Sequence, residues 1–315
     1  MSENSKIEWT DSTWNPLVAY RGEKRGWHCE KITPACDNCY AASMNKRSDG
    51  LVGIGTGLPY APDQRAKLRF EVHEPTLLAP LKWRKPRKIF VCSMTDLFGD
   101  WWTDEQILRV IAVASQTPEH TYQFLTKRPA RAIEILGHPK IEEYVDRVGR
   151  MNGWCHSNAE GRFPLPNVWL GVTAENQEQA DARISLLLET PAAKRFVSIE
   201  PMLGEVDLTN LTVPTANGPE QWDGLDKLDA ADAEPGTTSA TLDWVIAGGE
   251  SGPKARPSHP DWFRSLRNQC QASGVPFFFK QWGELNEHQF RVGKKAAGRL
   301  LDGVEWSQFP KGGAA

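Results

Sequence analysis

Six short apolar runs, rich in Val, Ile and Phe, recur along the chain, each flanked by Gly, Pro or polar residues. They are residues 88–92, 122–125, 168–172, 195–199, 244–247 and 276–279. Near-continuous apolar runs of this length are typical of strands in a parallel sheet that is buried on both faces.

Helical patterns alternate with these runs. The spacing of apolar residues predicts helices over 103–115, 129–136, 142–151, 176–189 and 260–273, and another from residue 41 onward. Thr103 and Asn176 stand at helix starts as N-caps, and Gly274 follows a helix as a C-cap.

Strand–helix alternation over six or seven units predicts an α/β fold with right-handed crossovers. The predicted architecture is a partial (β/α) TIM-like barrel, and the alternative is an open doubly wound sheet. No G-x-G-x-x-G follows an early strand, which argues against a dinucleotide-binding Rossmann fold.

The predicted domain organisation is a single (β/α) barrel domain over residues 1–283 with loop insertions. Residues 49–64 are rich in Gly and Pro and predict a long loop. Residues from about 205 to 241 predict a mobile acidic insertion without a catalytic role. Residues 284–315 form a polar C-terminal extension that predicts a small hairpin or lid.

Composition describes a soluble globular protein of 315 residues, 40% hydrophobic and 24% charged. The formal net charge of −3 does not indicate nucleic-acid binding, although a local basic face is compatible with it. No apolar run long enough for a membrane span and no secretory signal is visible. We therefore expect a reducing cytosol, where clustered cysteines indicate metal binding or catalysis and not disulfides.

Three of the six cysteines, Cys29, Cys36 and Cys39, form a C-x6-C-x2-C pattern between residues 29 and 39. Thiolates at this density indicate a zinc site or an iron–sulfur cluster. Three ligands would leave one metal position open. Each of the other three is expected to be a small buried apolar residue: Cys92, Cys155 and Cys270.

A structural zinc site would need a fourth ligand. His28 is adjacent to Cys29 and awkwardly placed, and Cys92 or His156 would reach the site only through the fold. A zinc deaminase would match the Pro34-to-Cys39 segment but would also need a separate H-x-E motif, and the H-x-E at His28–Glu30 has Cys29, one of the three clustered cysteines, as its middle residue. A zinc-binding protein without redox chemistry and a zinc-dependent hydrolase or deaminase remain the alternatives.

A [4Fe–4S] cluster on three cysteines leaves one iron free of protein ligands. That iron can chelate the amino and carboxylate groups of S-adenosylmethionine (SAM), whose reductive cleavage gives a 5′-deoxyadenosyl radical. Such a site requires polar groups at the carboxyl ends of neighbouring strands.

Every predicted strand is followed by polar or charged residues. They are Ser93 and Asp96, then Lys127 and Arg128, then Thr173, Glu175 and Asn176, then Glu200, then Gly248, Gly249 and Glu250, and finally Lys280 and Gln281. A buried Glu200 needs a partner, which Lys127, Arg128 or Lys280 could provide. Asp96 and Glu175 could instead satisfy helix N-terminal amides. The Gly pair permits close backbone approach to a ligand.

As an ordered set, several stretches resemble radical SAM proteins and, more narrowly, a phage-associated three-Cys-motif family of poorly known function. They are residues 7–16, 26–29 with 39–41, 93–98, 125–129, 167–172, 198–201, 248–252 and 278–283. Most radical SAM enzymes have a C-x3-C-x2-C motif, whereas the first gap here is six residues.

The resemblance implies a radical SAM enzyme that abstracts hydrogen from a substrate, with Cys29, Cys36 and Cys39 as cluster ligands. Strand order then predicts how the polar residues share the cofactor and substrate. Ser93 and Asp96 are assigned to the SAM amino group, Lys127 or Arg128 to its carboxylate, and Thr173, Glu175 or Asn176 to its ribose. Gly248 and Gly249 belong to the cofactor-binding set, and Glu200, Glu250 and Lys280 are predicted to be catalytic, with Arg256 and Gln281 nearby.

The phage setting of the resembling family implies a nucleic-acid or modified-base substrate. The basic, aromatic-bearing stretch 82–88 gives this substrate modest support, although a solvated connector explains it as well. The resemblance also implies a companion protein, and the chemistry requires an external electron donor.

Overall fold

All six predicted apolar runs form strands in the computed structural model, which describes residues 5–47, 54–154, 163–226 and 240–312. They are β5 (Lys88–Val91), β6 (Thr121–Thr126), β7 (Val168–Thr173), β8 (Lys194–Ile199), β11 (Trp244–Gly248) and β12 (Phe277–Gln281). A seventh strand, β1 (Ser12–Trp14), completes a sheet with the order β1-β5-β6-β7-β8-β11-β12. The fold is mixed α/β with a parallel sheet flanked by helices, compatible with a partial (β/α) barrel.

The predicted helices are also present, with ends shifted by a few residues at most. They are α1 (Tyr40–Lys46), α3 (Asp104–Gln116), α4 (Pro129–Leu136), α5 (Ile141–Met151), α6 (Gln177–Glu189) and α7 (Pro260–Ala272). Thr103 caps α3 in a full capping box, and the Asn176 side chain caps α6, as predicted. Shorter helical turns are η1 (Pro34–Cys36), η2 (Pro62–Lys67), α2 (Glu74–Leu77), η3 (Pro80–Lys82) and α8 (Lys294–Ala297).

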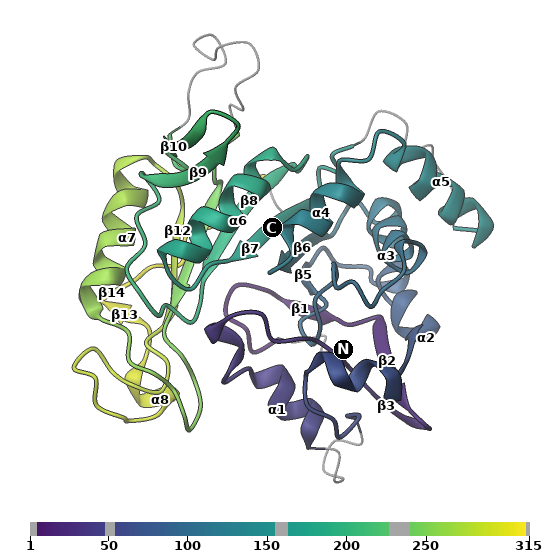
Figure 1. Cartoon of the computed structure of the whole chain (residues 1–315), viewed down its shortest axis with the longest axis horizontal. Coiled ribbons are helices and arrows are strands. Elements are labelled where there is room, and N and C mark those ends of the chain that lie inside the picture. Colours follow the sequence, from purple (N-terminus) through teal and green to yellow (C-terminus); the bar gives the residue numbers. More distant parts are fainter. Residues whose placement is uncertain (1–4, 48–53, 155–162, 227–239, 313–315) are drawn as a thin grey trace. The chain divides into compact units, whose positions relative to one another are not determined.

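The chain divides into two compact units, drawn in purple to teal and in teal to yellow in Figure 1. Unit 1 comprises Met1–Trp169 with Gly313–Ala315, and unit 2 comprises Leu170–Gly312. In unit 1, β5 pairs in parallel with both β1 and β6. The carboxyl ends of these three strands therefore lie at one edge of the sheet, where α/β folds bind ligands.

A small antiparallel sheet accompanies these strands in unit 1. Its order is β3-β2-β4, formed by β2 (Leu17–Arg21), β3 (Lys24–Gly26) and β4 (Arg69–Val72). Because β3 and β4 both pair with β2, residues 27–68 form an excursion that leaves the small sheet after β3 and returns to it at β4. This excursion contains the three clustered cysteines.

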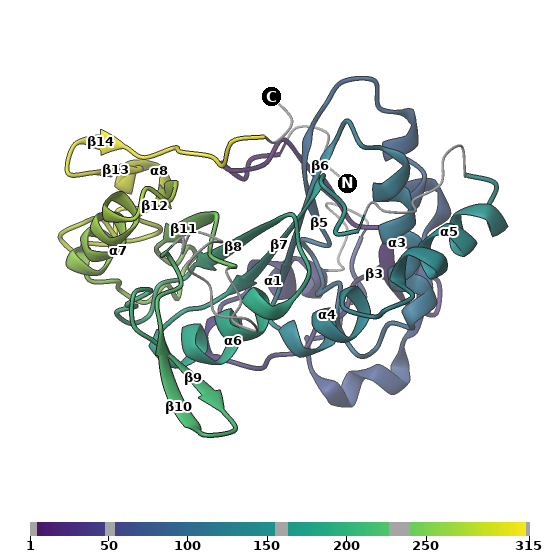
Figure 2. The same cartoon turned by 90° about the horizontal axis from the view of Figure 1, so that it is seen from above.

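Part of the predicted mobile insertion, about residues 205–241, has regular secondary structure. Residues there form the antiparallel hairpin of β9 (Leu211–Thr215) and β10 (Gly218–Trp222), which Figure 2 shows extending from unit 2 beside α6. Leu211 and Val213 on β9 are buried, so an alternating apolar pattern anchors the hairpin. Residues 227–239 lie outside the described residues.

The polar C-terminal extension contains a hairpin, as predicted. It is formed by β13 (Leu300–Leu301) and β14 (Val304–Glu305). The chain then continues along β12, where the Phe279 amide donates to the Trp306 carbonyl at 2.9 Å. The extension thereby covers the free edge of a terminal strand of the sheet. Among the helices within the described ranges, none is long and apolar enough to cross a membrane.

Candidate functional site

The three clustered cysteines lie in the connection between the small sheet and α1. Cys29 follows β3, Cys36 is the last residue of η1, and Cys39 is the N-cap of α1. Backbone hydrogen bonds from Cys36 to Thr33 and from Cys39 to Cys36 turn the loop back on itself. The six-residue gap in the motif therefore contains a tight helical turn. All three thiols are free and partly exposed.

The thiols approach one another around a small apolar cluster. Tyr60, Met94 and Ala41 form this cluster, and Cys29 and Cys39 pack against it. Burial raises the pKa of the Cys29 thiol to about 12, and the charges of Asp96, Cys39 and Cys36 raise it further, whereas Arg128 opposes the shift. Cys29 and Cys39 thus share the same apolar neighbours, and the charges of Cys39 and Cys36 both act on the Cys29 thiol. Thiolates there therefore need a positive counter-charge.

Hydrogen bonds join the cysteine loop to the carboxyl end of β5. The Tyr40 hydroxyl donates to the Ser93 carbonyl at 2.7 Å, and the Tyr60 hydroxyl donates to the Met94 carbonyl at 2.6 Å. Thr95 donates its hydroxyl to the carbonyl of His28, next to Cys29. The cysteine loop is therefore held against the carboxyl end of β5.

Asn15 connects β1 to the same place. Its side chain donates to the Ser93 hydroxyl at 3.1 Å and accepts the Met94 amide at 3.0 Å. Asn15 was missed from the sequence, although it follows β1 as Ser93 follows β5. Finding Asn15 from the sequence would have required the prediction of β1, a strand of only three residues.

Asp96, a predicted ligand of the SAM amino group, is buried and accepts four hydrogen bonds. Its donors are the amide of Phe98, the hydroxyl of Thr126, the amide of Lys127 and the guanidinium of Arg128, at 2.7 to 3.2 Å. A carboxylate has about four acceptor sites, so these contacts fill it. Asp96 therefore joins the ends of β5 and β6, and an amine would have to displace one of these donors.

A second acid, Glu30, holds the other side of the cysteine loop and was not predicted. Its carboxylate accepts from Arg65, with one of the two contacts at 2.8 Å, and lies 3.2 Å from the His28 ring. Arg65 also reaches Asp100 at 2.8 Å. Glu30 follows Cys29 directly, so this ion pair fixes the backbone beside the first thiol.

The donor set suits a group that binds several thiolates. Within the described ranges, no three His, Cys, Asp or Glu side chains are placed to hold a single metal ion. A single zinc ion brings its thiolates to about 2.3 Å from one centre, whereas the thiolates of a [4Fe–4S] cluster each bind a different iron and stand further apart. Three cysteine thiols in one loop are the donor type that such a cluster requires, whereas His28 is bonded to Glu30 and Cys92 is buried. His156 and Cys155 lie outside the described residues.

In unit 2, Glu200 has the partner that the sequence required. Lys280 donates to both carboxylate oxygens, at 2.7 and 2.9 Å, and Gln281 donates to one of them at 3.3 Å. Successive side chains on a regular strand point to opposite faces. Here the pairing of β11 with β12 shifts register between Ala247 and Gly248, and this β-bulge lets Lys280 and Gln281 both reach Glu200.

Glu250, predicted as a catalytic acid, is buried in a bidentate pair with Arg256. The two guanidinium contacts measure 2.9 and 2.5 Å, and the Arg256 amide adds a third at 2.8 Å. Gly249 next to it has no room for a side chain, because a Cβ atom would stand 1.9 Å from the Trp282 carbonyl oxygen. The group that lies so close to Gly249 is thus the backbone carbonyl of Trp282. At Gly248 a Cβ atom would meet only ordinary contacts, including the Glu200 carboxyl carbon at 3.5 Å.

The three predicted ribose ligands are all engaged within unit 2. Glu175 is fully buried and pairs with Arg183 at 3.3 Å, and the same guanidinium donates to the Thr173 carbonyl at 2.6 Å. Asn176 uses its side-chain oxygen to accept the Gln179 amide at 3.1 Å as the cap of α6. Neither Asp96 nor Glu175 serves as a helix cap, because Thr103 and Asn176 do so.

The model of a protein family described as "protein of unknown function (DUF5131)" matches residues 4–310. The chain belongs to this family. No curated protein and no solved structure matches it. The family description names no activity, so it neither supports nor excludes the chemistry expected from the cysteine motif.

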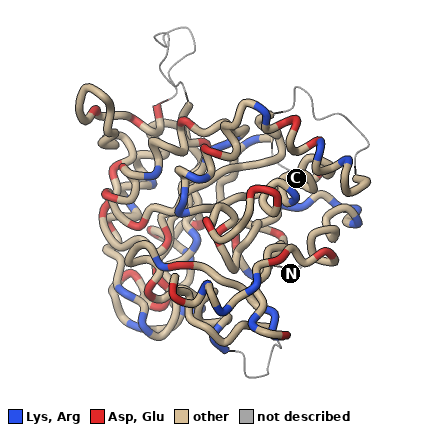
Figure 3. The backbone as a smooth tube through the Cα atoms, turned by 45° about the vertical axis from the view of Figure 1, so that its right-hand side comes forward, with Lys and Arg blue, Asp and Glu red and all other residues tan. Residues whose placement is uncertain are grey.

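The basic stretch 82–88 of this DUF5131 protein lies at the amino end of β5, which begins at Lys88. Lys82, Arg84 and Lys85 are exposed, whereas Arg87 packs over the Trp83 ring at 4.9 Å. Lys and Arg are otherwise interspersed with Asp and Glu along the chain (Figure 3). Because the thiols lie at the carboxyl end of β5, the stretch and the cysteine loop occupy opposite ends of the strand.

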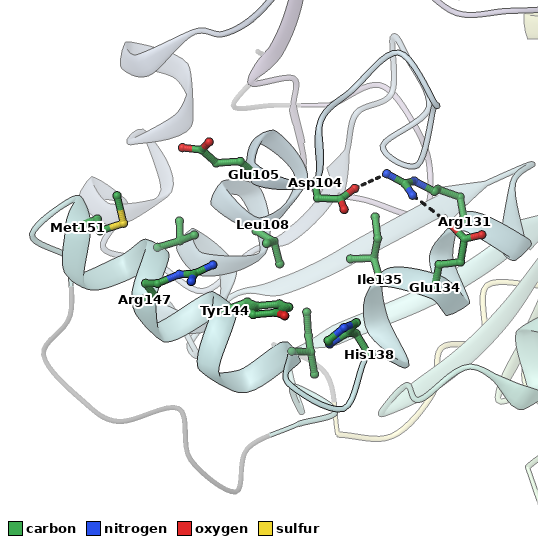
Figure 4. A pocket seen from close by; sticks show the side chains of 12 residues that line it. Asp104, Glu105, Leu108, Arg131, Glu134, Ile135, His138, Tyr144, Arg147 and Met151 are labelled. Atoms are coloured by element: carbon green, nitrogen blue, oxygen red, sulfur yellow. Dashed lines mark hydrogen bonds and ion pairs between the residues drawn. The ribbon is translucent and has the colours of Figure 1, made fainter.

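A pocket of about 590 Å³ lies between α3, α4 and α5 in unit 1 (Figure 4). At one side Arg131 bridges Asp104 and Glu134, and the Tyr144 ring lies beside His138 with their centroids 4.9 Å apart. No predicted site residue lines it. The pocket is therefore separate from the cysteine site of the DUF5131 chain.

Proposed function

We propose that this chain is a radical SAM enzyme in which Cys29, Cys36 and Cys39 hold a [4Fe–4S] cluster. One observation carries the proposal. The cysteine loop, which carries three cysteines within eleven residues, is hydrogen-bonded to the carboxyl end of β5. The bound cluster would supply the electron that cleaves SAM into methionine and a 5′-deoxyadenosyl radical.

The contacts in unit 1 indicate which side chains are available for the carboxylate and the amino group of SAM. Arg128 is committed to Asp96, whereas within the described ranges the Lys127 ammonium makes no ion pair. Lys127 is therefore the cation available for the SAM carboxylate. Ser93, next to the Tyr40 contact, is proposed for the amino group, and Asp96 supports the site by fixing Lys127 and Arg128.

In unit 2, the proposed catalytic groups are Glu200, Glu250 and Lys280. The Glu200–Lys280 pair holds a carboxylate and an ammonium side by side, and these are groups that can accept or donate a proton once a substrate lies within hydrogen-bond reach. Gly248 has no side chain beside the Glu200 carboxyl group, where a Cβ atom would stand 3.5 Å away. Thr173, Glu175 and Asn176 are proposed for the ribose.

A nucleic acid or a modified base is the proposed substrate. If the stretch 82–88 anchors such a polymer, it does so at the strand end opposite the thiols. Affinity for DNA or RNA would then fall steeply as salt rises, because phosphate contacts release counterions. A flat salt dependence would exclude this substrate class.

The decisive experiment is anaerobic reconstitution with iron and sulfide, reduction with dithionite, and a search for 5′-deoxyadenosine after SAM is added. We expect a brown protein with about four irons per chain and formation of 5′-deoxyadenosine. A colourless zinc protein would contradict the proposal and favour a zinc-binding function. A loaded, reduced cluster that leaves SAM intact would also contradict it.

Substitution of each clustered cysteine, as Cys29→Ala, Cys36→Ala or Cys39→Ala, should abolish iron uptake, because each thiolate binds its own iron. The matched controls are Cys92→Ala and Cys270→Ala, since both residues are free and buried away from solvent. Iron content and far-UV circular dichroism measure the result. If Cys92→Ala also lost the iron, Cys92 would be a fourth ligand and the open iron would not exist.

A further inference from the structure

A tight turn in the C-terminal extension of unit 2 holds an aromatic ring in solvent. The Asn286 side chain accepts the amides of His288 and Phe290 at 3.1 and 2.9 Å, and the Asn286 amide donates to the Phe290 carbonyl at 2.9 Å. Phe290 is nevertheless 67% exposed, and Val292 on the same segment is 44% exposed. The turn therefore fixes the position of a ring that makes little contact with the rest of the chain.

The segment that carries this ring is basic. Residues 288–299 contain four Lys or Arg residues and no acid. Lys294 and Lys295 are exposed on the short helix α8. Glu287, the acid that precedes the segment, lies beside the His288 ring at 3.7 Å. Because the whole chain has a net charge of −3, this run of positive charge is a local feature.

Arg291 ties the basic segment to a second loop of unit 2. Its guanidinium donates to the carbonyls of Gly252 and Ala255, at 3.2 and 3.0 Å. Lys254, between these two residues in the sequence, is exposed and adds another cation. The same loop carries Glu250, one of the proposed catalytic groups. Segments about forty residues apart in the sequence thus form one surface.

We propose that a basic aromatic surface of unit 2 binds single-stranded nucleic acid. Its members are Phe290, Lys254, Lys294 and Lys295. The Phe290 ring stacks on a base, and the lysines contact phosphates. The inference rests on the proposed function where it makes this ligand the substrate, whereas the binding itself is argued from unit 2 alone. It also goes beyond the stretch 82–88, which belongs to unit 1.

The combination of groups favours a single strand over other polyanions. Positive charge alone would suit an acidic protein or a duplex equally well. The bases of a duplex are already stacked on one another, however, and an acidic protein offers no base. An exposed aromatic ring beside several cations is the combination that proteins use to bind unpaired bases and their phosphates together.

The first test measures oligonucleotide affinity by fluorescence anisotropy, with the full chain free of added iron and SAM. The probes are oligo(dT) and oligo(U) of about 15 nucleotides and a DNA duplex of the same length. We expect Phe290→Ser to weaken single-strand binding at least about fivefold and to leave duplex binding within about twofold, because only the stacking contact is lost. Phe290→Tyr should match the wild type. Met151→Ser, at a residue of unit 1 that is 76% exposed, is the matched control and should also match it.

The second test measures how single-strand affinity depends on salt. The double variant Lys294→Gln/Lys295→Gln should lower the slope of log affinity against log salt by about 1.4, since each phosphate contact on a single strand contributes about 0.7. Lys85→Gln, at an exposed lysine of the stretch 82–88, is the matched control and should leave the slope unchanged. Circular dichroism checks that all variants keep the fold.

Unchanged single-strand affinity in Phe290→Ser would overturn the inference. An equal loss of duplex binding would also overturn it, because the ring would then not act on unpaired bases. Competition by poly(Glu) as effective as competition by oligo(dT) would indicate an acidic protein partner instead. A salt slope that falls in Lys85→Gln but not in the double lysine variant would move the site to residues 82–88.

The proposed function and this inference fail separately. If single-strand binding depends on Phe290 while the reconstituted chain forms no 5′-deoxyadenosine, the proposed function falls and the inference stands. If 5′-deoxyadenosine forms but neither oligo(dT) nor oligo(U) binds, the inference alone is overturned. The comparison of the two oligonucleotides shows whether DNA or RNA is the preferred ligand.

Discussion

Asp96 is the residue through which the ends of two strands are joined. The sequence placed it after β5 and Arg128 after β6, but it offered no sign that they would pair. Their contact at 3.2 Å depends on the parallel register of β5 and β6, which is a tertiary property. Residue identity and strand order therefore predicted that both residues follow strand ends, whereas their pairing could be seen only in the structure.

We predict that Asp96→Asn destabilises unit 1 by about 3 kcal/mol, because an amide cannot accept from four donors and Arg128 would lose its buried partner. Urea denaturation followed by tryptophan fluorescence measures the change. Asp100→Asn is the matched control, since Asp100 also lies near Arg128 but its side chain is 62% exposed. It should change stability by no more than about 0.5 kcal/mol. Equal effects of the two substitutions would refute the assigned role of Asp96.

At the scale of elements, periodicity predicted every long strand and helix in the described ranges. It missed β1 and the small sheet of β2, β3 and β4, because their segments are short, partly polar and paired across a long excursion. It also missed the hairpin of β9 and β10, since acidic composition in the same region outweighed the alternation of Leu211 and Val213. Short strands are stabilised by their partners, and a local pattern does not show those partners.

Substitutions of Gly248 and Gly249, at the end of β11, test whether each glycine is needed for close packing or for ligand space. Gly249→Ala should destabilise the protein by more than 2 kcal/mol, on the order of an overpacked core, because its Cβ would overlap the Trp282 carbonyl. Gly248→Ala should leave stability within about 1 kcal/mol. Thermal unfolding of the two variants provides the comparison.

If Gly248 keeps space for a ligand beside Glu200, Gly248→Ala should reduce SAM cleavage while the fold stays intact. Normal turnover in that variant would show that the glycine pair serves packing alone. Comparable stability of both variants would contradict the backbone contact described for Gly249.

At the scale of the whole molecule, the chain's response to acid should be concentrated in unit 1. Burial lowers the pKa of His73 and of His120, and Arg25 lowers that of His73 further. The unfolded chain binds protons at both residues near pH 6.5, and the folded chain does not. The free energy of unfolding should therefore be fully present above about pH 6.5 and fall as the pH drops below it.

Urea denaturation between pH 8 and pH 5.5 tests this expectation, with hydrogen exchange assigning the loss to a unit. The double variant His73→Gln/His120→Gln should show a flatter dependence on pH than the wild type, whatever its absolute stability. An unchanged slope would exclude these two side chains as the cause.

The pairing of β2 with β4 has a consequence for how a metal centre would be made. The excursion that carries the cysteines is closed by backbone hydrogen bonds and not by a metal, so its closure is already provided by the fold. The cysteine loop is therefore held in place by the backbone pairing of the small sheet. If the loop binds the proposed cluster, that cluster could be inserted into the folded chain, and replaced after oxidation, without refolding.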